Sequence, residues 1–200
     1  MDSDKRTQLL RAAVQLFAEN GYDGTSLRAI SEAAGANLSM ISYYFGGKHG
    51  LYEEAFASQL RGLTGFLSAD TDNMDPRDVI RLYADTALRV HQDNPYLVRY
   101  ITRELLAQDG STPAIYPPLN AIYGVLDRTV RRGIAAGLFR DDLNVPSVVV
   151  LLAGAVNFHY LAQHVRARIT ADRRDIPGEA AYLLQAVEVF LRGIERRDDS

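Results

Sequence analysis

Apolar residues recur at helical spacing along the whole chain, and this periodicity constrains the fold more than any other feature. In the first such segment, residues 4–20, Leu9, Ala13, Leu16 and Phe17 share one face. An amphipathic helix requires this pattern. No convincing two-residue alternation marks a strand. The sequence therefore predicts an all-α protein of about nine helices.

The expected helices change in length near Tyr44. Before it they are short and end at Gly21, Gly35 and Gly46, and after it they are long. We interpret residues 1–47 as a small three-helix DNA-binding domain and residues 48–200 as a helical bundle for ligand binding and dimerisation. The approximate expected bounds are 4–20, 26–34, 38–44, 48–63, 76–93, 96–108, 119–137, 146–169 and 178–196.

Composition excludes several classes of protein. The 200 residues are 47% hydrophobic, enough for a sizeable core, and they contain no cysteine for a disulfide, a thiolate site or a nucleophile. The longest apolar run, 145–156, is shorter than the ~20 residues of a membrane span. Residues 1–6 lead into no signal-peptide core. We expect a cytoplasmic protein with no membrane contact, cofactor or metal.

The segment from about Thr25 to Tyr44 predicts a helix-turn-helix. Gly35 provides the tight turn, the small Ala33 and Ala34 allow two helices to approach, and Ile41 fills the core between them. The second helix would then turn polar and accessible side chains outward, as a groove-binding helix requires. The outward side chains are Ser39, Met40, Ser42 and Tyr43.

From Phe17 to Phe56 the chain resembles the TetR/AcrR family of bacterial transcriptional regulators. The motifs that carry this resemblance are Gly21-Tyr22, Thr25-Ser26, Ile30 with Ala34-Gly35, Tyr43-Tyr44-Phe45 and Lys48. The resemblance implies that Ser39, Met40 and Ser42 contact bases. It also implies that Thr25, Arg28, Tyr43, Tyr44 and Lys48 hold phosphates. At the helix starts, Thr25 and Ser26 are expected to leave free N–H groups and hydroxyls that suit a phosphate oxygen, and Asn37 is a further base reader.

The resemblance also implies a small-molecule effector bound inside the bundle. Candidate ligand residues are polar or aromatic side chains at core-like spacing. They are Tyr83, Arg99, Tyr100, Arg103, Glu104, Tyr116, Tyr123, Asn157 and His159. Arg99 and Arg103 share a helix face, so they either bind a carboxylate together or form a surface pair. Asn157 and His159 either line a pocket or bond across a dimer interface.

The last two helices predict a homodimer. Two adjacent apolar stripes on the terminal helix exceed what one neighbouring helix covers, so a second copy would complete a four-helix bundle. The stripes are Leu183, Val187, Phe190 and Ile194, and Tyr182, Ala186, Val189 and Gly193. A two-fold dimer predicts a palindromic operator in double-stranded DNA. We expect a ligand-responsive regulator, in most members of such a family a repressor.

Two other readings stay open beside the regulator. Residues 1–56 carry more acids than bases and the net charge is −3, although DNA-binding domains are usually basic. A helical binding module that has lost its DNA affinity would fit that charge. An enzyme fits less well, because no cysteine nucleophile, nucleophile elbow or phosphate loop is present. Salt-dependent DNA binding separates these readings.

Overall fold

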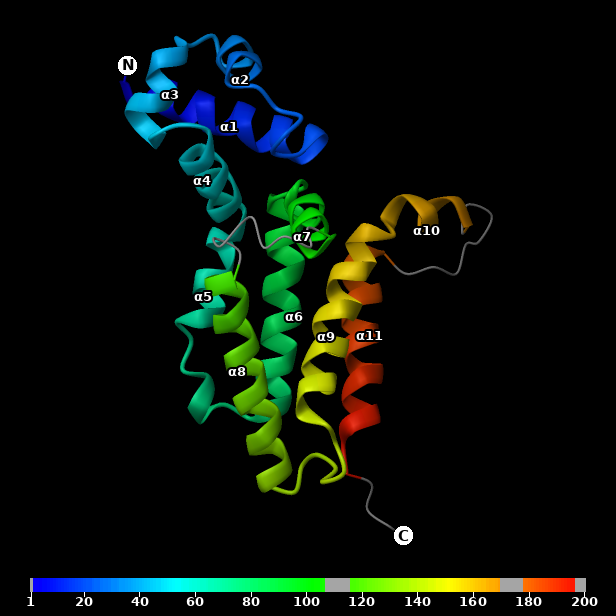
Figure 1. The fold of residues 1–200 in the computed structure, drawn as a ribbon. Helices are drawn as coiled ribbons and strands as arrows, with labels where there is room; N and C mark the ends of the chain where they lie inside the picture. The colour runs from blue at the N-terminus through cyan, green and yellow to red at the C-terminus, as the bar shows by residue number, and fades with distance from the viewer. Residues whose placement is uncertain (1, 107–115, 170–177, 197–200) are drawn as a thin grey trace. The chain divides into compact units, whose positions relative to one another are not determined.

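The computed structural model describes residues 2–106, 116–169 and 178–196, and their regular structure is helical, as predicted. Within these ranges lie eleven α-helices and two short 3-10 helices, and the β-type pairing consists of one isolated bridge between Phe139 and Glu195. The chain divides into two compact units. Unit 1 comprises residues 1–61 and 94–118, and unit 2 comprises residues 62–93 and 119–200. Figure 1 shows the element order.

Unit 1 contains the three predicted N-terminal helices and two further ones. They are α1 (Asp2–Asn20), α2 (Leu27–Ala33), α3 (Leu38–Phe45), α4 (Lys48–Leu60) and α7 (Leu97–Leu106). α1 packs against α2, α3, α4 and α7. The compact unit is thus not the same set of residues as 1–47, and the predicted division after Gly47 stays a prediction about function.

An aromatic cluster forms the core of unit 1 between α1, α4 and α7. The Phe17 and Tyr52 rings meet edge to face at 4.9 Å, and Tyr52 and Phe56 each lie 5.8 Å from the ring of Tyr100. Such pairs add about 0.5–1.5 kcal/mol each to the effect of burial. α7 is therefore an integral part of the unit that carries the helix-turn-helix.

Unit 2 is a helical bundle. Its elements are η1 (Arg61–Leu63), α5 (Thr64–Leu67), η2 (Thr71–Asn73), α6 (Pro76–Asp93), α8 (Tyr116–Ala135), α9 (Val145–Leu161), α10 (Gln163–Ile169) and α11 (Glu179–Ile194). The first residue of η1 and the first three residues of α8 are counted in unit 1. In Figure 1, α6, α9 and α11 run lengthwise side by side, and each packs on the other two. Arg81 of α6 and Glu188 of α11 add a two-point ion pair at 2.7 and 3.2 Å.

Three predicted bounds needed correction. The helix expected over 146–169 ends at Leu161, and α10 begins after Ala162; the helix expected over 48–63 ends at Leu60. The first interruption adds α10, and α5, which follows η1 outside the predicted ranges, is the other helix beyond the nine predicted. α8 starts at Tyr116 rather than 119, because Pro117 and Pro118 fit the first turn of a helix, where a backbone N–H has no partner to lose.

Candidate DNA-binding surface and effector site

The helix-turn-helix is built by two side-chain caps and two glycines. Ser26 caps α2 by accepting from the Ala29 N–H at 3.1 Å, and Asn37 caps α3 by accepting from the Ser39 N–H at 3.0 Å. Gly35 in the turn and Gly46 after α3 have φ of +55° and +70°, a region that favours glycine. The sequence thus fixes where each short helix begins and ends.

α3 has one buried and one exposed face. Ile41 and Phe45 are buried, as expected for the residues that hold this helix on the unit. Ser39 and Ser42 are exposed, Met40 is half-buried, and Tyr43 is 77% exposed. An aromatic side chain this exposed on a short helix gains little from the protein's own core, so it is available to a partner.

The residues predicted to hold phosphates divide into accessible and engaged ones. Thr25 is buried, and its hydroxyl lies 2.7 Å from the Gly21 carbonyl and 3.0 Å from the Leu16 carbonyl. This corrects the expectation of a free hydroxyl there: Thr25 ties the start of α2 to the end of α1. Arg28 is exposed and paired with Glu32, and the Lys48 amine lies 4.5 Å from the centre of the Tyr22 ring.

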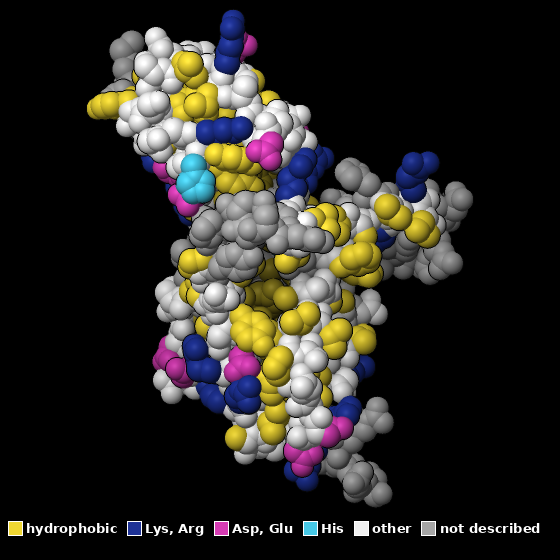
Figure 2. Space-filling model, in the orientation of Figure 1, with side chains coloured by type: hydrophobic (Ala, Val, Ile, Leu, Met, Phe, Trp, Pro, Cys, Tyr) yellow, Lys and Arg dark blue, Asp and Glu magenta, His cyan; other side chains and the backbone are white. Residues whose placement is uncertain are grey.

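Two further residues of the predicted surface have internal roles. The Asn37 side-chain oxygen accepts both the Ser39 N–H and the Ser39 hydroxyl at 3.0 Å, so its capping role limits how it can read a base. The Tyr44 ring is half-buried between those of Tyr43 and Phe45, with edge contacts at 4.9 and 6.1 Å. On the face of unit 1 in Figure 2, basic and acidic side chains are interspersed.

Four predicted ligand residues lie on α7 in unit 1. The Tyr100 hydroxyl donates to the Val14 carbonyl at 3.1 Å, and the Tyr52 hydroxyl donates to Glu104. Arg103 donates to the carbonyls of Ala18 and Glu19 at the end of α1, at 3.3 and 2.8 Å. Only Arg99 remains exposed without such a bond. The structure therefore does not bring Arg99 and Arg103 together as a carboxylate clamp, because Arg103 caps α1.

The other predicted ligand residues belong largely to unit 2. Tyr83 is buried, and burial raises its pKa to about 12, whereas Tyr123 is 37% exposed. The side chain of Tyr116 lies outside the described residues. Asn157 and His159 lie on α9, the first half-buried and the second 4% exposed.

Around His159 the structure assembles a polar and aromatic cluster that the sequence did not reveal as one site. The His91 ring, from α6, stacks on Tyr160 at 4.0 Å. The His159 ring stacks on Tyr182 at 4.7 Å, and its Nδ1 lies 3.0 Å from an Arg166 guanidinium nitrogen. His91 could have been identified from the sequence as a buried polar residue, because it lies on the apolar face of α6, one turn after Ala87.

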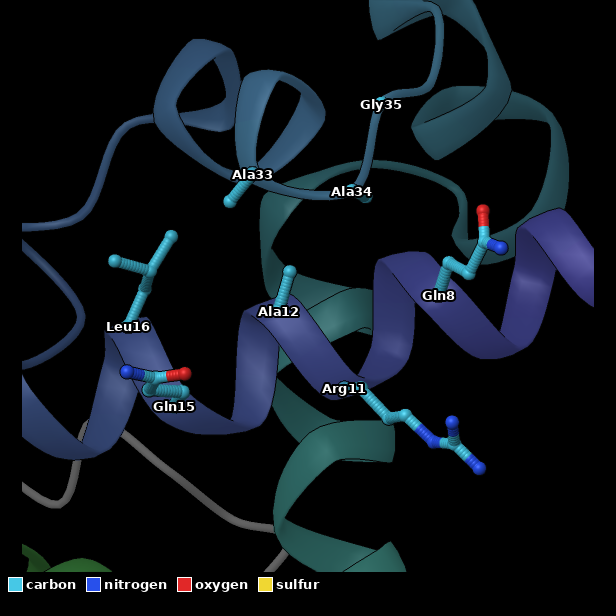
Figure 3. A pocket seen from close by; sticks show the side chains of 8 residues that line it. All are labelled: Gln8, Arg11, Ala12, Gln15, Leu16, Ala33, Ala34 and Gly35. Carbon is cyan, nitrogen blue, oxygen red and sulfur yellow. The ribbon is translucent and has the colours of Figure 1, made fainter.

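A cleft of about 560 Å³ lies between α1 and α2. In Figure 3, Ala12 and Leu16 point toward α2, whereas Arg11 points away from it. Small side chains and glutamine amides make up most of the lining, which offers an incoming molecule little apolar area to bury. The lining residues are Gln8, Arg11, Ala12, Gln15, Leu16, Ala33, Ala34 and Gly35, none of which is among the predicted ligand contacts.

The residues of the two predicted dimer stripes differ in their exposure, and some of them are buried in the core. Leu183, Val187 and Ile194 lie in the core of unit 2, so they cannot line an interface. The exposed members are Tyr182, Val189 and Gly193, and Ala186 and Phe190 are half-buried. Figure 2 shows hydrophobic side chains gathered on the visible face of unit 2. The exposed large apolar residues of α9 and α11 are Val150, Leu151, Phe158, Leu161, Tyr182, Leu184 and Val189.

Comparison with known proteins assigns both parts of the chain. The family model of bacterial regulatory proteins, tetR family, matches residues 9–55. The model of the tetracyclin repressor-like C-terminal domain matches residues 76–187, more than half of the chain. The chain belongs to the TetR family. As a TetR-family protein it is a DNA-binding regulator of transcription, and residues 9–55 contain the whole helix-turn-helix described above.

Relatives and solved structures agree with the TetR assignment. The HTH-type transcriptional repressor NicS of Pseudomonas putida is 30% identical over 96% of this chain and 92% of its own. The HTH-type transcriptional regulator RutR of Escherichia coli is 32% identical over 52% of this chain and 50% of its own. These relatives are named as regulators of transcription, not as enzymes.

Two solved structures share the fold. HlyIIR, a hemolysin II transcriptional regulator, superposes with a TM-score of 0.75 at 21% identity over 98% of this chain and all of its own. FadR of Bacillus subtilis, solved in complex with stearoyl-CoA, superposes with a TM-score of 0.72 at 19% identity over 95% of this chain and all of its own. No described helix of this chain has the length and apolar character needed to cross a membrane.

Proposed function

We propose that this TetR-family protein is a repressor that binds a palindromic operator as a homodimer and is modulated by a small-molecule effector. The observation that carries the proposal is the α2–Gly35–α3 module, whose second helix exposes Ser39, Ser42 and Tyr43 while Ile41 and Phe45 anchor it. The cytoplasmic location expected from the sequence stays a prediction.

Base contacts are assigned to the exposed face of α3. Ser39, Met40 and Ser42 are short or flexible enough to approach base edges, and Tyr43 is placed to reach a phosphate. Ser26, Arg28, Tyr44 and Lys48 complete the proposed backbone contacts. Thr25 is assigned a positioning role, because its hydroxyl is used within the unit.

Dimerisation is assigned to the exposed apolar face of α9 and α11. Leu151, Phe158 and Val189 are 64, 65 and 65% exposed, and a contiguous apolar surface of this kind usually marks an interface. The core residues Leu183, Val187 and Ile194 support this face from inside. A monomeric mass at micromolar concentration would contradict the dimer. Leu151→Asp should yield monomer, while Leu38→Asp, at an exposed leucine of unit 1, should leave the mass unchanged.

Effector binding is assigned to unit 2, with Tyr83, Tyr123, Asn157 and His159 as the candidate contacts. The complex of FadR with stearoyl-CoA supports the assignment by showing a ligand on a protein of the same fold. Arg99, Tyr100, Arg103 and Glu104 belong to unit 1 and are not part of this assignment.

Salt-dependent binding tests the function. Affinity for fragments of genomic DNA should fall steeply with salt, by a slope of about −0.9 for each phosphate contact on a logarithmic plot. Tyr43→Ala should weaken this binding, and Tyr123→Ala, at an exposed tyrosine of unit 2, is the matched control. Absence of binding at low salt, with the apo protein and with ligand present, would favour the binding module without DNA affinity.

A further inference from the structure

Three polar side chains of unit 2, the buried His91 and His159 and the half-buried Asn157, lie on the packed helices α6 and α9. His91 and His159 are 9 and 4% exposed. The positive charge that His91 would carry helps to lower the pKa of His159. Asn157 lies beside His91, but neither its Oδ1 nor His91 Nε2 makes a bond of hydrogen-bond geometry. We call His91, Asn157 and His159 the polar triad.

Each member of the triad has one satisfied atom and one unsatisfied atom. His91 uses Nδ1 at 2.9 Å from the Ala87 carbonyl, and Asn157 uses its amide nitrogen at 2.9 Å from the Ala153 carbonyl. His159 uses Nδ1 at 3.0 Å from Arg166. His91 Nε2, Asn157 Oδ1 and His159 Nε2 are buried and have no hydrogen-bond partner in the protein.

The satisfied bonds fix which unsatisfied atoms donate and which accept. A carbonyl only accepts, so His91 Nδ1 carries the proton and its Nε2 is an acceptor. A guanidinium only donates, so His159 Nδ1 is the acceptor and its Nε2–H is a donor. Burial lowers the pKa of both rings, which keeps them neutral near neutral pH. The triad thus offers two acceptors and one donor.

This arrangement disfavours charged ligands. A carboxylate would place its oxygens against the lone pairs of Asn157 Oδ1 and His91 Nε2, with one donor to bind it. An ammonium group would be bound by these acceptors but would lie near the Arg166 guanidinium, whose contacts with His159 and with the Tyr182 ring at 5.0 Å fix its positive charge at the site. A buried charge without a well-placed counter-charge is costly.

We propose that the polar triad recognises an uncharged group that donates one or two N–H or O–H hydrogens and accepts one hydrogen bond, such as an amide or a hydroxyl. The inference rests on the proposed effector binding in unit 2 and names the chemistry that the effector presents there. His91 and Asn157 accept from the ligand, and His159 donates to it. Arg166 is a positioning residue, which holds His159 in the donating form.

Three near-isosteric probes test this chemistry in the full-length protein. Benzamide donates and accepts, methyl benzoate only accepts, and benzoate accepts and is charged. Ring-nitrogen NMR signals of His91 and His159 report the contact directly. Benzamide should shift both Nε2 signals, and the other two probes should bind at least ~10-fold more weakly, the equivalent of one net hydrogen bond.

Variants separate recognition from folding. Asn157→Leu and His159→Phe should weaken benzamide binding at least ~10-fold. Asn157→Leu should not lower the melting temperature, because the leucine replaces an unpaired buried acceptor with an apolar group of similar volume. The matched control is Asn120→Leu at an exposed position of α8, which should leave benzamide binding unchanged.

Three results would contradict recognition of an uncharged donor group by the polar triad. Equal shifts with benzoate or methyl benzoate would overturn the inference, as would no shift with any probe up to its solubility limit, the result if the triad holds only water. A marked loss of stability in Asn157→Leu would also overturn it. DNA binding by the same samples tests the proposed function separately, so either claim can fail alone.

Discussion

The two units treat their buried polar groups in opposite ways. Among the described residues of unit 1, no buried side-chain nitrogen or oxygen lacks a partner, and Thr25 and Tyr100 both donate to carbonyls of α1 or of the turn that follows it. In unit 2, the atoms without a hydrogen-bond partner include His91 Nε2, Asn157 Oδ1 and His159 Nε2.

This difference is consistent with the DNA binding proposed for unit 1 and the effector binding proposed for unit 2. A reading helix must be held in one position, and internal hydrogen bonds to α1 fix the elements around it. A ligand site must keep polar groups available, although each unsatisfied buried group costs about 1–3 kcal/mol. We therefore expect substitutions in the core of unit 1 to lower the free energy of unfolding more than substitutions in the polar triad of unit 2.

The largest predicted effect is in the aromatic core of unit 1. Phe17→Ala should lower the free energy of unfolding by about 3–5 kcal/mol, because the Phe17 ring is fully buried against Tyr52. Tyr43→Ala removes an exposed ring and should stay within about 0.5 kcal/mol of wild type. Urea denaturation measures both. Similar losses in the two variants would contradict the description of α3 as exposed.

A second effect depends on pH and belongs to unit 2. Burial, helped by the charges of Arg166 and His91, lowers the pKa of His159 from 6.5 to about 4. Between these values the unfolded chain binds a proton that the folded protein does not. The free energy of unfolding should therefore rise with pH from about 4 to 6.5 and then level off.

Urea midpoints across this pH range check the dependence. His159→Phe should flatten the rise, leaving the share of His91, whose pKa is also lowered by burial. Asn120→Leu, at an exposed position of α8, should leave the profile as in wild type. A profile unchanged by His159→Phe would show that His159 is not held neutral.

A smaller loss is expected at Tyr100. Tyr100→Phe keeps the buried ring and removes the hydroxyl that donates to the Val14 carbonyl, which should cost about 1 kcal/mol. Thermal or urea unfolding measures the loss. If Tyr100→Phe were neutral while Asn157→Leu destabilised the protein, the contrast between the two units would be reversed.

The smallest expected effect is at Lys48, and it concerns DNA binding rather than folding. Lys48→Ala should reduce the slope of logarithmic affinity against logarithmic salt by about one per protomer, because one phosphate contact is lost. Arg128→Ala, at an exposed position of α8 in unit 2, serves as a control. An unchanged slope would mean that the Lys48 amine stays above the Tyr22 ring, where it lies 4.5 Å from the ring centre.

The helical class and the reading head were predictable because local signals determine them. Glycine with positive φ at Gly35 and Gly46, caps at Ser26 and Asn37, and apolar spacing at Ile41 and Phe45 act within a few residues of chain. The same reasoning gave Thr25 a free hydroxyl, because its partners at Leu16 and Gly21 depend on how α1 packs.

The effector side was less predictable because its contacts join distant segments. Asn157 and His159 were visible as polar interruptions of an apolar helix, but His91 lies more than sixty residues away and reaches them only through the packing of α6 on α9. Arg103 looked like a ligand contact because nothing in its own helix indicates that the end of α1 lies beside it.

Selection of bound sequences from random double-stranded DNA tests α3 as the reading helix and the dimer in one experiment. A dimer with two such helices should enrich one palindrome, whose half-sites are separated by one helical turn or a multiple of it. Ser42→Ala and Ser39→Ala should change the enriched bases without abolishing binding. Enrichment of no sequence, or of a single asymmetric half-site by a monomer, would contradict the assignment of α3 as the reading helix of a dimeric regulator.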